Sequence, residues 1–174
     1  MMRNRLCALA LSAPLVTICL NASAYGGDCQ PVFDALMKVA TTPSHSYTTN
    51  TALNGGRSAE GETIIANGQK YIRAHGKWMR IPVTSQDVVE QEKEEEQHGK
   101  STCQFLRDES VNGEAAMLFS MHREYEQVEE DAQMWVSRGT GLLLRAEKDV
   151  DHRGNKVKEH RSTRLEYGDI RPPM

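Results

Sequence analysis

The sequence of 174 residues predicts a mainly β fold of the α+β class, built on one large antiparallel sheet. From Ser44 onward, apolar and polar residues alternate with the period of two that is typical of strands. Asn-Gly pairs at 67–68 and 112–113 are strong signals for tight hairpins, which join antiparallel strands. Only the segments 28–43 and 84–99 have the composition and spacing of helices.

The start of the chain has the pattern of a cleaved secretory signal. Arg3 and Arg5 give it a positive charge, an apolar core follows, and Ala22-Ser23-Ala24 has the small-x-small form of a cleavage site. The apolar core is too short for a comfortable bilayer span of about 20 residues. We therefore expect residues 1–24 to be a cleaved signal peptide and residues 25–174 to form a single periplasmic domain. We expect no integral membrane segment in this mature chain.

Removal of the signal would leave two cysteines, Cys29 and Cys103. Cys7 and Cys19 would leave with it, and lipidation of Cys19 is disfavoured because the bulky Ile18 precedes it. Two cysteines in an exported chain most simply form one disulfide. A metal site needs more ligands than this pair supplies. We expect a Cys29–Cys103 disulfide and no metal site, with two unpaired thiols as the less favoured alternative.

The charge balance argues against nucleic acid as a partner. The chain has 21 basic and 24 acidic residues, a net charge of −3 that becomes about −5 without the two arginines of the signal. A protein that binds nucleic acid or anionic membranes usually carries a basic face instead. The sequence also has no phosphate loop and no nucleophile elbow. We therefore expect no nucleic-acid partner and no cofactor.

One pair of residues raises the question of catalysis. His122 and Glu124 lie two positions apart on a predicted strand, so they share a face and could act as a base or bind a metal. Two polar residues on the wet side of a sheet are the favoured explanation. We expect no catalytic residues, and a hydrolase that uses His122 is the least favoured function.

The N-terminal helix is predicted over residues 28–43. Asp28 can cap it, Pro31 fits its first turn because the missing N–H is harmless there, and Pro43 ends it. An apolar stripe at helical spacing follows one side of the helix: Val32, Leu36 and Val39. Four short strands in a meander are predicted between this helix and the next.

The second helix is predicted over residues 84–99. Thr84 and Asp87 fit a capping box, and Gly99 stands where a C-terminal cap belongs. The acidic run 92–96 is expected to be a solvated helix face rather than a binding site. After Cys103 the strand pattern resumes, and roughly nine strands are expected in all.

Residues 134–147 contain the most distinctive local pattern. A Met-Trp-Val strand is followed by Thr140-Gly141 and then by Leu-Leu-Leu-Arg-Ala-Glu. With Gly76-Lys77-Trp78 and the closing Tyr-Gly-Asp-Ile, this pattern resembles the LolA-like superfamily of periplasmic half-barrel proteins. That superfamily includes lipoprotein carriers and the LolA-like domain of RseB/MucB-type envelope stress sensors. The resemblance implies an unclosed half-barrel with an acyl-binding concave face, covered by the N-terminal helix and a second short helix.

Together these features predict a non-enzymatic periplasmic protein that binds a lipid or a lipidated polypeptide in an apolar groove. Flexible methionines suit such a surface. The candidate ligand-binding residues are Trp78, Met117, Phe119, Met121, Leu142 and Leu144. Strand alternation predicts that Leu142 and Leu144 face inward and that Leu143 faces outward, where it is either covered by a neighbouring helix or exposed near the strand end. An ordinary core under one helix is the alternative explanation of this apolar set. A protein-interaction or sensor module of an envelope complex is the alternative function.

Overall fold

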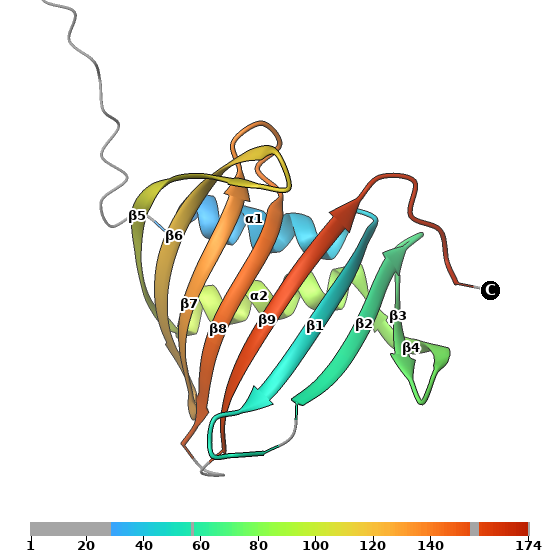
Figure 1. Ribbon diagram of the computed structural model, residues 1–174, viewed down its shortest axis with the longest axis horizontal. Helices are drawn as coiled ribbons and strands as arrows, with labels where there is room; N and C mark the ends of the chain where they lie inside the picture. Colours follow the sequence, from blue (N-terminus) through green and yellow to red (C-terminus); the bar gives the residue numbers. More distant parts are fainter. Residues whose placement is uncertain (1–28, 57, 154–156, 174) are drawn as a thin grey trace, which may run out of the picture.

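The computed structural model describes residues 29–173 apart from positions 57 and 154–156 (Figure 1). The predicted signal peptide, residues 1–24, and the predicted helix cap Asp28 lie outside the described residues. Within the described part, no helix is both long and apolar enough to cross a membrane.

Two helices and nine strands make up the described part of the chain. In chain order they are α1 (Gln30–Thr41), β1 (Ser44–Ala52), β2 (Ser58–Ala66), β3 (Gln69–Ala74), β4 (Lys77–Thr84), α2 (Ser85–His98), β5 (Lys100–Val111), β6 (Glu114–Tyr125), β7 (Val128–Ser137), β8 (Leu143–His152) and β9 (Val157–Tyr167). The strands form one antiparallel sheet in the order β4-β3-β2-β1-β9-β8-β7-β6-β5.

The sheet is an unclosed half-barrel, so the predicted fold class is confirmed. Pairing of β1 with β9 joins two meanders, β1 to β4 and β5 to β9. The edge strands β4 and β5 are not paired with each other, and α2 is the segment of chain that connects them. Both helices lie on the same side of the sheet (Figure 1). We call this side the helix-covered face and the other side the open face.

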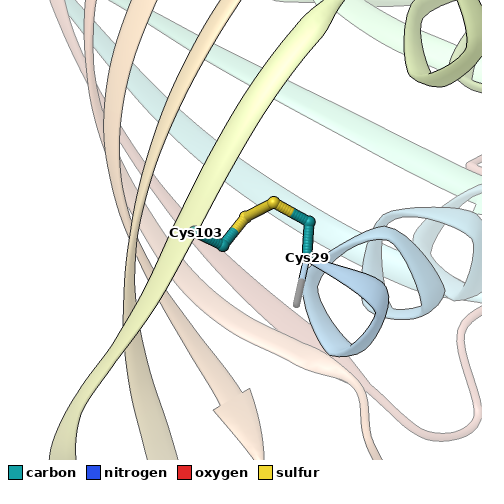
Figure 2. The surroundings of a disulfide bond; sticks show 2 residues. All are labelled: Cys29 and Cys103. Carbon is teal, nitrogen blue, oxygen red and sulfur yellow. A yellow bond between two sulfur atoms is a disulfide. The ribbon is translucent and has the colours of Figure 1, made fainter. Parts of the chain in front are cut away.

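The helix α1 packs its apolar stripe onto β7 and β8. Pro31 stands in its first turn, and the N-cap residue is Cys29 rather than Asp28, without a capping hydrogen bond from its side chain. The predicted disulfide between Cys29 and Cys103 is present, with a Cα–Cα distance of 5.0 Å (Figure 2). It fixes the start of α1 to β5. Because a lone helix of this length is marginal in water, this packing and tether hold it in place.

Strand alternation places the core beneath α1. Phe119 and Met121 face α1 and are fully or almost fully buried. The other members of this core come from both sides of the contact: Cys29, Val32, Phe33, Ala35, Leu36, Cys103, Ala132, Met134, Val136, Leu143, Ala146 and Leu165. On the neighbouring positions of β6, polar side chains such as His122 face the other way. The large core residues are therefore already packed against a helix.

The predicted outward orientation of Leu143 is wrong. Leu143, expected to face outward, is buried in the core beneath α1, whereas Leu144 packs with Trp135 in a separate cluster. The cause is a β-bulge in the pairing of β7 with β8. Trp135 is opposite Arg145, but the next residue of β7 is opposite Leu143, so Leu144 is the inserted residue. A bulge reverses the alternation on one side of the insertion.

The helix α2 begins and ends as predicted, since the Thr84–Asp87 capping box is present and Gly99 is the C-cap residue. None of its residues is fully buried. The prediction that the whole acidic run is a solvated face is nevertheless wrong. Glu92 and Glu95 turn toward the sheet and lie 3.5 and 2.9 Å from the guanidinium of Arg123 on β6.

A small ionic cluster thus lies between α2 and the sheet. Arg123 is only 8% exposed, and a buried guanidinium needs carboxylate partners to offset its lost hydration. Glu130 on β7 is its third partner and also accepts a hydrogen bond from Lys148 at 2.9 Å. Burial raises the pKa of Glu92 despite the nearby arginine. Burial alone would also raise the pKa of Glu130, but Lys148 and Arg123 outweigh it and lower that pKa.

Loss of the disulfide should weaken the anchoring of α1. The closed loop spans 74 residues, for which chain entropy gives about 4 kcal/mol of stabilisation as an upper figure. We expect the Cys29→Ala/Cys103→Ala variant to unfold at a clearly lower denaturant concentration than the oxidised wild type, as followed by circular dichroism. A reductant should lower the midpoint of the wild type and leave that of the variant unchanged. Equal midpoints for variant and wild type would contradict this account.

Candidate binding groove

The open face carries a groove of about 950 Å³ across β5 to β9. Most of its lining residues are outward-facing ones that alternate with the core beneath α1, and three core residues, Cys103, Met121 and Ala132, also line it. Uncharged polar groups, such as those of Gln104, Ser120 and Gln133, lie between the charged ones. The charged or titratable residues that line the groove are His122, Asp131, Arg145, Glu147, Lys148, Asp149 and His160.

Four of these residues form a row across four adjacent strands. The sheet register pairs His122 with Asp131, Asp131 with Asp149, and Asp149 with His160. The imidazole Nδ1 of His122 lies 2.8 Å from Oδ1 of Asp131, and Nδ1 of His160 lies 2.7 Å from Oδ1 of Asp149. Two carboxylates are therefore direct cross-strand neighbours, an arrangement that is unfavourable unless positive charge lies beside them.

Each histidine has carboxylates at both of its ring nitrogens. Nε2 of His122 is 3.6 Å from Glu124, and Nε2 of His160 is 3.0 Å from Glu147. The hydrogen bond to Asp131 is the main reason that the pKa of His122 is raised, and the bond to Asp149 acts in the same way on His160. The carboxylates thus hold both rings in place and favour their protonated form. Neither presents a free nitrogen that would serve as a base toward a substrate.

The groove is negatively charged when both histidines are neutral. Arg145 offsets one of the three carboxylates and contacts Glu147 at 2.7 Å, which leaves a net charge of −2. Lys148 does not change this balance, because its amine is bonded to Glu130 on the helix-covered face. The remaining carboxylates, on Asp131 and Asp149, have side chains that are 70% and 60% exposed. They are open to a ligand.

A second hollow of about 510 Å³ continues the groove along the open face. It shares Arg145 and Ser162 with the groove and extends to the tip of the β5–β6 hairpin. Trp135 lies in its wall, where its indole N–H donates to Glu109 at 2.6 Å. The Arg145 guanidinium stacks over the indole ring at 4.7 Å. The two hollows together make an elongated depression with an aromatic flank.

The predicted ligand-binding residues do not come together at one site. Phe119 and Met121 are in the core beneath α1, and Met117 packs at its margin. Leu144 belongs to the separate cluster with Trp135, and Leu142 lies just before β8. Trp78 lies on β4, with its ring edge-on to that of His45 at 5.8 Å. The structure therefore brings only three of the six residues together, Met117, Phe119 and Met121, and they lie beneath α1.

The residues that line the groove were largely missed by sequence reasoning. His122 was singled out, but with Glu124 as its partner, whereas the structure gives it Asp131 as the nearer one. Polar residues two apart do occur on β7, β8 and β9, and this signal identifies a wet face. Their union into one row depends on the register of four strands, which no single strand reveals.

Comparisons with protein-family models and with curated protein sequences find no match to the sequence. Among solved structures, the chain is similar to LprF from Mycobacterium bovis, with a TM-score of 0.42 and 9% identity over 85% of this chain and 99% of that one. It is also similar to Pseudomonas aeruginosa MucB in its complex with MucA (TM-score 0.43, 13% identity, 83% of this chain and 59% of that one). A third likeness is to the LolA superfamily protein NE2245 from Nitrosomonas europaea (TM-score 0.27, 8% identity, 82% and 94%). These likenesses are remote, so we base the function on the geometry of this chain.

Removal of one aspartate should change the titration of its histidine partner. We expect Asp131→Asn to lower the pKa of His122 toward its usual value of 6.5, because the bond that favours the protonated ring is lost. Since that pKa is raised by folding, the pair's contribution to stability is full below about 6.5 and is lost as the pH rises through the raised value. A titration of the histidine ring signals by NMR measures the shift. Asp149→Asn is the control and should lower chiefly the pKa of His160. An unchanged pKa of His122 in the Asp131→Asn variant would show that His122 and Asp131 do not form a pair.

Proposed function

We propose that the chain is a non-enzymatic binding module of the cell envelope, which holds a basic segment of a partner protein in the groove of the open face. The observation that carries the proposal is the groove itself, about 950 Å³ with a net charge of −2 when its histidines are neutral. Charge complementarity of this kind selects partners and speeds their encounter. The exposed carboxylates of Asp131 and Asp149 are the groups that a lysine or arginine side chain would meet.

The shape of the site supports a polypeptide as the ligand. The groove crosses five strands and continues into the hollow beside Trp135, so it is long enough for an extended segment. The amide and hydroxyl groups of Gln104, Ser120 and Gln133 can exchange hydrogen bonds with a peptide backbone. A basic side chain would find the aromatic face of Trp135 partly taken by Arg145, which leaves the two aspartates as its main partners.

The proposal includes a periplasmic location and a mature chain of residues 25–174 that forms one domain. The predicted signal peptide is the reason for both, and the Cys29–Cys103 disulfide supports an oxidising compartment. It also includes the absence of catalysis, supported by the two histidines whose ring nitrogens all face carboxylates.

A labelled peptide rich in lysine and arginine provides the test. At slightly alkaline pH we expect it to bind with an affinity that falls as salt is added, while an acidic peptide of equal length does not bind. Asp149→Asn should weaken binding several-fold, as measured by fluorescence anisotropy.

Asp108→Asn is the matched control for this variant. The Asp108 side chain is exposed to nearly the same extent as that of Asp149, 59% against 60%, but it lines neither hollow of the open face. We expect its affinity to equal that of the wild type. Equal binding of basic and acidic peptides, or equal losses in the two variants, would exclude the groove as the binding site.

The methionines beneath α1 favour a second candidate function, the acyl-chain binding that the sequence predicts. Met117, Met121 and Met134 are adaptable side chains around Phe119, and the disulfide fixes only the start of α1. An acyl chain bound there would have to displace the rest of α1, because Phe119 is fully buried. Of the six residues predicted to line a lipid groove, Trp78, Leu142 and Leu144 lie outside this region.

Native mass spectrometry of the gently purified protein separates the two candidates. Under the groove proposal we expect the mass of the polypeptide alone, because the apolar core is closed by α1. A stoichiometric co-purifying lipid that disappears in a Met121→Glu variant would favour the second candidate. The folded state of that variant can be verified by circular dichroism.

A further inference from the structure

We propose that the row His122–Asp131–Asp149–His160 makes binding in the open-face groove depend on pH. A basic segment binds when both histidines are neutral and is released when both are protonated. This inference rests on the proposed function, since it concerns the same groove, and it adds a regulatory role for histidines that are not themselves the ligand's main partners.

The geometry places the two histidines where a proton competes directly with a bound cation. Asp131 and Asp149 are cross-strand neighbours, and each has a histidine as its other neighbour. The ring-to-carboxylate distances are 2.8 and 2.7 Å, so each imidazolium would be hydrogen-bonded to the carboxylate that the ligand needs. Protonation of both rings brings the net charge of the groove from −2 to zero. Protonation therefore removes the electrostatic attraction between the groove and a basic segment where the two would meet.

His122 is the group in its surroundings whose charge changes near neutral pH. The charged residues facing it are Asp131, Glu124, Glu129, Arg153 and Lys100. Arg153 contacts Glu129 at 2.6 Å and Glu124 at 3.8 Å, so it partly offsets these two carboxylates. On the β5 side, the direct neighbour of His122 is the uncharged Thr102. Among side chains, histidine is the one whose usual pKa brings its change of charge between about pH 5 and 8.

The surroundings of His160 are similar. The charged residues on the same face are Asp149, Glu147, Arg145, Asp151 and Lys158. Arg145 is paired with Glu147, and Lys158 with Asp151 at 2.6 Å. The direct neighbour on β1 is the uncharged Thr51. His160 is thus bonded to two carboxylates, of which one already has an arginine partner.

The direction of the pH effect follows from these contacts. The pKa values of both histidines are raised, chiefly by the bonds to Asp131 and Asp149, so the change lies above the usual value of 6.5. Binding of a basic segment therefore strengthens as the pH rises through the raised values and weakens as it falls below them. Because the coupling is reciprocal, the bound segment must also lower the pKa values of the two rings.

Peptide binding at several pH values tests the inference. We use the labelled lysine- and arginine-rich peptide, with its N-terminus acetylated, between about pH 5.5 and 8.5, a range in which its own charge is constant. We expect the affinity of the wild type to fall about tenfold toward the acid end, as loss of two exposed charge contacts implies. The His122→Gln/His160→Gln variant should bind with nearly the same affinity across the range. His98→Gln, on the exposed last turn of α2, is the control and should retain the full pH dependence.

The possible outcomes separate this inference from the proposed function. Peptide binding with the same pH dependence in wild type and double variant would overturn the role of the row and leave the groove proposal standing. A peptide affinity of the wild type that does not change with pH would do the same. Absence of peptide binding at every pH would overturn both. NMR titration of the two rings with and without peptide provides a second readout, in which unchanged pKa values on saturation with peptide would also refute the coupling.

Discussion

The packing of α1 against β7 and β8 is the contact on which the rest of the structure depends. In a strand, successive side chains point to opposite faces, so covering one face decides the environment of both. Phe119 and Met121 meet α1 and are buried, which leaves Ser120 and His122 on the open face. The disulfide at Cys29 fixes where the helix begins. The location of the apolar core therefore also sets the location of the groove.

The two helices cover different kinds of surface. Beneath α1 the sheet is apolar, whereas the contacts of α2 with the sheet include an ionic cluster around Arg123. Removing one partner from such a cluster is costly, because the other charges would remain without compensation in a region of low hydration. The helix-covered face is thus occupied by packed apolar groups in one part and by paired charges in another. A ligand could enter the core beneath α1 only by displacing that helix, whereas the groove on the open face is accessible without such a movement.

Local patterns predicted the elements of this fold well. The period of two, the Asn-Gly turns and the Thr84–Asp87 capping box each involve residues close in sequence, and the structure has them. The predictions that failed depend on residues that are far apart in the sequence. The bulge opposite Trp135 reversed the orientation of Leu143, and no residue in that segment announces it. Glu92 and Glu95 looked like members of a solvated run because their partner, Arg123, lies on another element.

The candidate site shows the same limit more strongly. His122 could be noticed, yet its row requires three strand pairings in register, and each pairing is set by hairpins and bulges elsewhere. The apolar residues that the sequence predicts as ligand-binding were easy to find because they are conspicuous. The same property makes such residues the natural core beneath a helix. Phe119, Met121 and Leu144 of this set are buried, whereas the polar residues at alternating positions of β6 lie on the accessible surface.

The central claim is that a ligand binds to the open face while the core beneath α1 stays closed. Methyl NMR of the methionines, recorded together with the histidine ring signals during addition of a basic peptide, tests it most directly. Met134 reports on the core beneath α1, and His122 and His160 report on the groove. We predict that the two histidine signals shift and saturate while the methyl signal of Met134 stays in place. A shift of Met134 with unchanged histidine signals would place the ligand beneath α1 and contradict the account.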